Sequence, residues 1–86
     1  MIKLSATVIT FNEEENIDRC LKSLVEVADE IVIVDSNSKD RTEELCKKYN
    51  AKFYTHRFLG YKEQKGYAVE KASNDYIISL DADEAL

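Results

Sequence analysis

Residues 30–35, which read Glu-Ile-Val-Ile-Val-Asp, constrain the fold of this chain more than any other segment. Four apolar β-branched residues in succession predict a strand that is buried on both of its faces. Such a strand is typical of a parallel sheet that helices cover on both sides. No apolar run in the chain approaches the roughly 20 residues that span a bilayer, so no membrane span is predicted.

Strand and helix patterns alternate along the whole chain. The predicted strands are 3–9, 30–35, 52–55 and 75–80, and the predicted helices are 13–26, 41–49 and 61–73. This βαβαβαβ order with short connections predicts right-handed crossovers and a mostly parallel sheet of about four strands. We therefore expect an α/β fold with three layers. Asn12 is predicted to cap the first helix, Asp40 or Ser38 the second, and Asn50 to end the second in a left-handed conformation.

The composition limits the classes of function that need to be considered. The 86 residues give room for one domain, and 12 basic against 17 acidic residues give a net charge of −5. This balance argues against a nucleic-acid binder, because such proteins carry a basic face. Cys20 and Cys46 fall in predicted helices, and we expect buried free thiols in a cytosolic protein. The sequence has no Cys/His cluster, so we expect no zinc site.

Two carboxylates follow the last predicted strand, at Asp81 and Asp83. Ligands of parallel α/β sheets bind beyond the carboxyl ends of the strands, so this position is a candidate site. If the strand geometry continues, both side chains point to one side and repel each other unless a cation lies between them. Mg²⁺ is usually bound by one or two carboxylates together with substrate phosphates, so the pair predicts half of a metal-diphosphate site. The alternative is a solvated strand end.

Polar residues also follow the other strands. The carboxylate of Asp35 is suited to accept hydrogen bonds from a ribose or a base, and its alternative role is an Asx turn or a helix cap. Thr10, Phe11 and Asn12 offer a hydroxyl, an aromatic face and an amide beside a helix start, and alternatively they form only a strand exit and an N-cap. Lys65 is placed to reach a phosphate or a nucleobase, or else it is a solvated helix side chain.

The chain resembles, in the order and spacing of three motifs, the N-terminal half of family 2 glycosyltransferases with the GT-A fold. The motifs read "TVITFNEEENIDRCLKSL", "EIVIVDSNSKDRTEELCKKYNAK" and "NDYIISLDADE". The resemblance extends from Leu4 to Glu84 and implies the Rossmann-like, donor-binding half of a GT-A domain. The stretch "GYKEQKGYA" is similar to the branch of bacterial β-glucosyltransferases that act on the lipopolysaccharide core.

The resemblance assigns roles to individual residues. Those that would contact a nucleotide-sugar donor, of which a UDP-sugar is the first choice, are Thr10, Phe11, Asn12, Asp35, Lys65 and Asp81. Asp81 and Asp83 match the DxD motif, which binds Mn²⁺ or Mg²⁺ and the donor diphosphate. Ile9 stands where the family usually has a proline, and Ser36 stands where it often has an acid. Both departures leave the preferred nucleobase open.

The activity that the resemblance implies is inverting transfer of a sugar to a glycan or a lipid-linked acceptor. The general base of the family comes from the second half of its domain. We therefore expect residues 1–86 to be a donor-binding part that is truncated after the DxD motif, holds no catalytic residue and is inactive by itself. The full-length protein is expected in the cytoplasm, peripherally at the inner membrane.

Other readings of the same pattern are weaker. A phosphoacceptor signalling domain would need clustered acids after its first strand and a phosphorylatable Asp after its third, where this chain has Thr55-His56. A phosphatase-like site would carry its D-x-D after a first strand. A non-catalytic nucleotide-binding or interaction domain stays open. The segment 76–80 is predicted to be an apolar edge strand, which invites a homodimer through that edge.

Overall fold

The computed structural model describes residues 3–82 of the chain. Its elements in chain order are β1 (Leu4–Thr10), α1 (Ile17–Leu24), β2 (Glu30–Asp35), α2 (Thr42–Lys47), β3 (Lys52–Thr55), α3 (Tyr61–Lys71) and β4 (Tyr76–Asp81). This order confirms the predicted βαβαβαβ alternation. None of the helices within 3–82 is long and apolar enough to cross a membrane.

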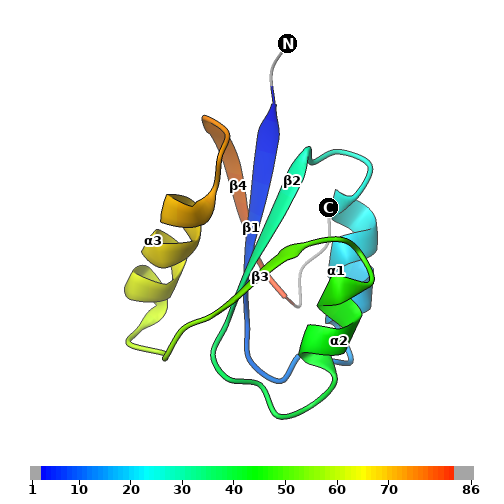
Figure 1. Cartoon of the computed structure of the whole chain (residues 1–86), viewed down its shortest axis with the longest axis vertical. Helices are drawn as coiled ribbons and strands as arrows, with labels where there is room; N and C mark the ends of the chain where they lie inside the picture. The colour runs from blue at the N-terminus through cyan, green and yellow to red at the C-terminus, as the bar shows by residue number, and fades with distance from the viewer. Residues whose placement is uncertain (1–2, 83–86) are drawn as a thin grey trace.

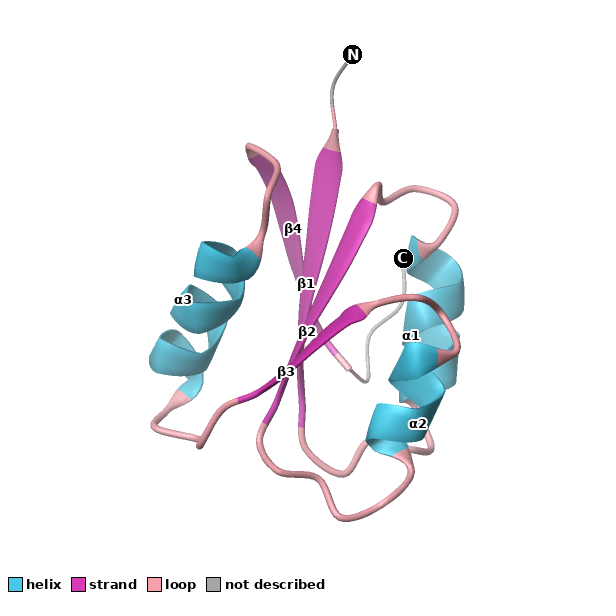
Figure 2. Ribbon diagram, viewed as in Figure 1, coloured by secondary structure: helices cyan, strands magenta, loops and turns pink. Residues whose placement is uncertain are grey.

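The four strands form one sheet in the order β3-β2-β1-β4, and every neighbouring pair is parallel. Helices α1 and α2 cover one face of the sheet and α3 covers the other, as Figures 1 and 2 show. The predicted three-layer α/β fold is therefore confirmed. The strand order reverses between β1 and β4, because the chain first builds outward through β2 and β3 and then returns to the other side of β1.

Strand β2 is buried on both faces, as the run 31–34 predicts. Ile31 and Ile33 belong to the core under α1 and α2, whereas Val32 and Val34 pack with Ala68 of α3. Because successive strand residues point to opposite faces, one continuous apolar run fills both cores. Full burial of each such side chain contributes about 1.5–3 kcal/mol.

The cysteines behave as small core residues. Cys20 and Cys46 are free thiols and both are buried in the core beneath α1 and α2. Burial raises the pKa of the Cys46 thiol to about 12, and the charge of Asp35 adds to this effect. Cys46 is therefore protonated and unreactive at neutral pH, which agrees with the sequence expectation.

The predicted helix boundaries are less accurate than the helices themselves. The first helix was expected over 13–26, but α1 begins at Ile17, and residues 13–16 form a turn whose Glu13 carbonyl accepts from Asn16 N and Ile17 N. The prediction that Asn12 caps this helix is wrong, because Asn12 has φ 50° and its side chain bonds elsewhere. Asn50 has the predicted left-handed conformation, with φ 61°.

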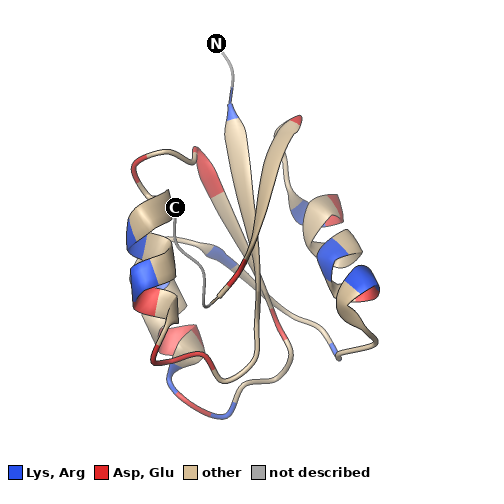
Figure 3. Ribbon diagram, turned by 180° about the vertical axis from the view of Figure 1, so that it is seen from behind, with Lys and Arg blue, Asp and Glu red and all other residues tan. Residues whose placement is uncertain are grey.

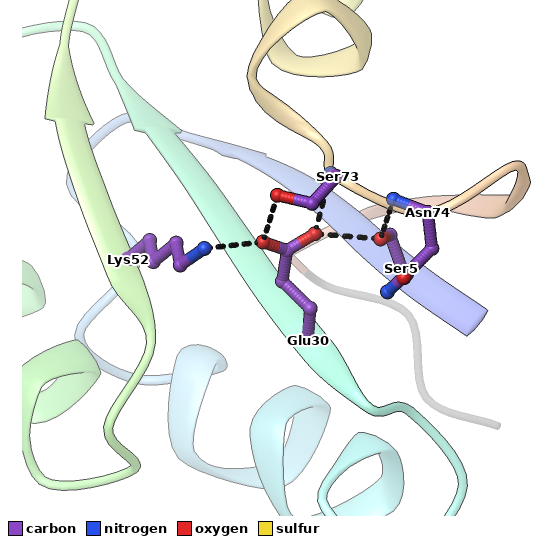
Figure 4. Close-up of polar contacts among 5 residues, drawn as sticks. All are labelled: Ser5, Glu30, Lys52, Ser73 and Asn74. Atoms are coloured by element: carbon purple, nitrogen blue, oxygen red, sulfur yellow. Dashed lines mark hydrogen bonds and ion pairs between the residues drawn. The ribbon is translucent and has the colours of Figure 1, made fainter. Parts of the chain in front are cut away.

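Glu30 joins the strands to one another at their amino ends (Figure 4). Its carboxylate accepts hydrogen bonds from Ser5 Oγ at 2.6 Å, from Lys52 Nζ at 2.5 Å, and from Ser73 N and Oγ at 2.8 and 3.0 Å. Asn74 N in turn donates to Ser5 Oγ at 3.3 Å. One side chain, 9% exposed, thereby joins β1, β2 and β3 to the connection between α3 and β4.

The two glycines at and within α3 predict substitutions of opposite sign. Gly60 precedes the helix with φ 121°, whereas Gly66 lies inside it, and an added Cβ meets nothing within 4 Å at either position. Gly60→Ala should lower the free energy of unfolding by about 1–2 kcal/mol through backbone strain. Gly66→Ala should raise it by about 0.5–1 kcal/mol. Urea unfolding followed by circular dichroism measures both, and midpoints that move in the same direction would contradict this account.

Candidate functional site

The sheet register brings the carboxyl ends of the strands together. Thr10 of β1 is level with Asp35 of β2, and Asp35 is level with Thr55 of β3. On the other side of β1, Ile9 is level with Asp81. The predicted site residues that end β1, β2 and β4 therefore lie together at the carboxyl ends of the strands. Most charged residues lie outside the sheet, on the helices and in the loops (Figure 3).

A cleft of about 490 Å³ lies at the carboxyl ends of the strands. Its lining residues are Ile9, Thr10, Phe11, Glu13, Ser36, Phe58, Tyr61, Gln64, Asp81 and Ala82. The cleft adjoins the ends of β1 and β4, where the strand order reverses and where ligands of open α/β sheets usually bind. Its volume falls within the range of about 300–1,000 Å³ that small-molecule sites occupy.

Asp35, the last residue of β2, is buried, with an exposed fraction of 3%. Its Oδ1 accepts from Thr10 Oγ1 at 2.6 Å and from Ser38 Oγ at 2.5 Å, and its Oδ2 accepts from Ser38 N at 2.7 Å. The carboxylate therefore shapes the loop after β2 and fixes the rotamer of Thr10. Asp35 is not among the residues that line the cleft within the described part of the chain.

Asn12 joins the loop after β1 to the loop after β2. Its backbone N donates to Ser38 Oγ at 2.7 Å, and its Oδ1 accepts from Lys39 N at 2.8 Å. Asp40 adds a second link between the two loops, because its carboxylate accepts hydrogen bonds from Thr42 N at 2.9 Å and from Glu14 N at 3.2 Å. These hydrogen bonds fix the two loops to each other and so give the edge of the cleft a defined shape.

Asp81, which lines the cleft, forms an ion pair with Lys65. Lys65 Nζ lies 3.7 Å from Asp81 Oδ1, and the two side chains are 48% and 51% exposed. A pair this exposed contributes at most about 1 kcal/mol to stability. The second predicted carboxylate, Asp83, lies outside the described residues.

The chemistry of Asp81 fits a hard divalent cation that arrives with phosphate ligands. Half of its side chain is open to solvent, and it lines the cleft. Within residues 3–82 there is no group of three or more His, Cys, Asp or Glu side chains that would form an all-protein metal site. Mg²⁺ in particular is commonly held by one or two carboxylates plus substrate phosphates, and that coordination needs no such group.

Seven of the ten residues that line the cleft were not among the predicted site residues: Ile9, Glu13, Ser36, Phe58, Tyr61, Gln64 and Ala82. Gln64 is the most deeply buried polar residue of these, with an exposed fraction of 1%. The rings of Phe58 and Tyr61 form an exposed edge-to-face pair with centroids 5.2 Å apart. Gln64 lies on the same helix face as Ala68, four residues later, but the sequence does not show which face of this helix is buried.

The sequence matches the model of glycosyl transferase family 2 over residues 5–86. The chain belongs to glycosyl transferase family 2. It is 42% identical over 84 residues to an uncharacterized glycosyltransferase of Rickettsia bellii, which covers 98% of this chain and 29% of the relative. It is 41% identical over 90 residues to LpsC, a lipopolysaccharide core biosynthesis glycosyltransferase of Rhizobium meliloti, covering 99% of this chain and 33% of LpsC. This family 2 chain thus spans about a third of the length of these relatives.

Solved structures show the same fold. Glucosyl-3-phosphoglycerate synthase of Mycobacterium tuberculosis, in complex with Mn²⁺, UDP and glucosyl-3-phosphoglycerate, aligns with a TM-score of 0.82 and 22% identity over 94% of this chain and 33% of the synthase. TarS 1–349 of S. aureus aligns with a TM-score of 0.80 and 26% identity over 98% of this chain and 28% of that protein. The family 2 chain therefore has the GT-A, Rossmann-like sheet that its motifs predict.

Proposed function

We propose that residues 1–86 form the nucleotide-sugar-binding part of an inverting family 2 glycosyltransferase. The observation that carries this proposal is the cleft at the carboxyl ends of the strands, which Thr10, Phe11 and Asp81 line, with Lys65 beside Asp81. An aromatic face and a charged end within one cleft match the two ends of a nucleoside diphosphate. A UDP-sugar is the proposed donor.

In this proposal the nucleoside lies along the ends of β1 and β2. The ring of Phe11 is exposed in the cleft and stacks on the base. Thr10 and Asn12 border the base, and Asp35 acts from below by holding Thr10 and the loop after β2, or by reaching the ribose when that loop moves. The departures at Ile9 and Ser36 alter the surroundings of the base, so the choice of nucleobase is the least constrained part of the proposal.

The diphosphate lies at the end of β4. Asp81 and Asp83 would hold Mn²⁺ or Mg²⁺ there, and the bound ion would supply positive charge against the departing nucleoside diphosphate. Lys65 adds a second positive charge at the same end of the cleft. Support comes from the synthase structures with UDP and Mn²⁺ or Mg²⁺, whose fold this chain shares.

The proposed reaction is a single displacement at the anomeric carbon. The acceptor hydroxyl attacks from the side opposite the nucleotide, a new C–O bond forms, and the bond to the diphosphate breaks. The hydroxyl proton passes to a general base, which we place outside these 86 residues. The isolated chain is therefore proposed to bind donor without transferring sugar.

The acceptor and setting are proposed from the relatives. Similarity to LpsC favours a glycan or lipid-linked acceptor of lipopolysaccharide core synthesis, handled in the cytoplasm at the inner membrane. Strand β4 is an edge of the described sheet and exposes Tyr76 and Ile77, so we also propose that a second copy pairs there. A strictly monomeric species in sedimentation at high concentration would contradict that pairing.

Titration of the labelled chain with UDP and a panel of UDP-sugars, with and without a divalent cation, tests the proposal. Mg²⁺ is used for amide shifts and Mn²⁺ for paramagnetic broadening. We expect shifts at Thr10, Phe11 and Lys65, and broadening centred on Asp81. A turnover assay with the same samples should give no sugar transfer. Absence of UDP binding, or shifts confined to other parts of the chain, would overturn the proposed function.

A further inference from the structure

We propose that Gln64 is a positioning residue of the donor site. Its buried side-chain amide fixes the first turn of α3, and with it Lys65, against the carboxyl ends of β2 and β3. The inference rests on the proposed function, because Lys65 is the group that Gln64 would position toward the diphosphate. It adds a residue that neither the motifs nor the family resemblance assigns to the site.

The amide of Gln64 joins three separate segments. Its Nε2 donates to Ser36 Oγ at 2.8 Å and to the carbonyl oxygen of His56 at 3.3 Å. Its Oε1 lies 3.2 Å from His56 Nδ1. Because Oε1 can only accept, this geometry requires that His56 Nδ1 carries the proton and donates. The imidazole also stacks on Tyr67 one turn further along α3, with ring centroids 4.1 Å apart.

Apolar contacts also hold α3 on the sheet, because Ala68 packs with Val32 and Val34 and Tyr67 packs against this cluster. The buried residues of the helix are Gln64 and Ala68, and its N-cap, Gly60, makes no side-chain cap hydrogen bond. A leucine would fill much the same space as Gln64 without the need to find hydrogen-bond partners for a buried amide. Packing alone therefore does not account for an amide at this place.

Hydrogen bonds fix a direction that apolar packing does not. Three contacts from one amide limit the rotation of α3 about its own axis, since each requires a narrow angle at the donor. The ammonium of the next residue, Lys65, lies at the end of a long side chain, so a rotation of α3 moves it farther than it moves the helix backbone. Such a rotation changes the direction from which Lys65 reaches the phosphate.

The chain of contacts continues to the other strands. Ser36, which accepts from Gln64, donates through its backbone N to the carbonyl of Thr10 at 3.0 Å. Lys65 contacts Asp81 at the end of β4. Gln64 lines the cleft. Through Ser36 and Lys65 it links the residues proposed for the nucleoside to those proposed for the diphosphate.

A double-mutant cycle on UDP binding with Mn²⁺ tests the proposal by calorimetry. The four proteins are the wild type, Gln64→Leu, Lys65→Ala and the double variant. We expect each single substitution to weaken binding by about 5–10-fold, and the double variant to bind within about twofold of Lys65→Ala, because residues that act as a unit are not additive. Effects that multiply, or a Gln64→Leu variant that binds UDP like the wild type, would overturn the positioning role.

Ala68→Gly is the matched control for a general weakening of the helix. It should lower the midpoint of urea unfolding while leaving the amide contacts and UDP affinity intact. If it weakens UDP binding as much as Gln64→Leu at equal loss of stability, the positioning role is wrong.

The tautomer of His56 gives a readout that needs no ligand. The nitrogen spectrum of neutral His56 should show the proton on Nδ1 in the wild type, and Gln64→Leu should shift it toward Nε2. A wild type with its proton on Nε2 would overturn the hydrogen-bond geometry. A wild type with the predicted tautomer but no affinity for UDP would instead refute the proposed function, and with it the positioning role.

Discussion

Asp81→Asn is expected to weaken UDP binding in the presence of Mn²⁺ by about 100-fold. Loss of groups that merely orient metal ligands already costs about 10–100-fold in metal affinity, so loss of a ligand carboxylate should reach the upper end of that range. The substitution keeps the size of the side chain and removes its charge. Because Asp81 is half exposed, the free energy of unfolding should change by no more than about 0.5 kcal/mol.

The sign of the effect should change when the metal is removed. With a chelator present, the Asp81 carboxylate faces the diphosphate without a cation between them, and the two negative charges repel each other. Asp81→Asn should then bind UDP as tightly as the wild type or more tightly. Calorimetric titrations with Mn²⁺ and with chelator measure both arms. Equal losses of affinity in the two arms would show that Asp81 acts on the fold or the nucleoside and not through a cation.

Asp75→Asn is the matched control. Asp75 is also exposed, and it lies directly before β4, at the opposite end of the strand from Asp81. The same change in charge at this position should leave UDP affinity unaltered in both arms. A comparable loss with Asp75→Asn would point to the net charge of the chain as the cause.

Glu30→Gln is expected to lower the free energy of unfolding by about 2 kcal/mol at neutral pH, which corresponds to about 8–16 °C in melting temperature. Burial of the Glu30 carboxyl acts to raise its pKa, but hydrogen bonds from Lys52, Ser5 and Ser73 outweigh burial and lower it from 4.5 to about 2. That shift corresponds to roughly 3 kcal/mol. The exposed ammonium of Lys52 argues for the smaller figure.

The stabilisation by Glu30 should depend on pH in one direction. A carboxyl whose pKa is depressed in the folded state stabilises the fold above its unfolded pKa of 4.5 and loses that effect as the pH falls toward about 2. Urea unfolding of wild type and Glu30→Gln should therefore differ fully at about pH 7 and by less than half as much at about pH 3. Glu26→Gln, an exposed residue past the end of α1, is the control and should show no such difference. A gap that widens in acid would contradict the assignment.

The fold was predictable because its signals are local. Residues 31–34 predict a strand with two buried faces. The alternation of strands and helices then allows only a few arrangements of the layers. Asp81 was predictable from its place directly after a strand. The helix-cap role of Asn12 was assigned wrongly because residues that cap helices also suit left-handed loop positions, and only the contacts with the loop after β2 decide between the two.

The polar networks were not predictable, because their partners come from distant parts of the chain. The carboxylate of Glu30 meets Ser5, Lys52 and Ser73 only after three strands are in register. Gln64 likewise finds Ser36 and His56 only when α3 lies on the sheet. Such contacts carry no periodic pattern in the sequence, so spacing alone does not reveal them.

The pairing of β1 with β4 sets the order in which the site is completed. Leu4 pairs with Tyr76 and Ile9 with Asp81, so β1, the earliest of the four described strands, receives one of its two neighbours last. The crossovers from β1 to β2 and from β2 to β3 close over short spans, whereas docking of β4 closes almost the whole chain and has the larger entropic cost. We therefore expect Thr10 and Asp35 to reach their positions before Asp81 does. Under the proposed function, donor and metal would bind together only after β4 has docked.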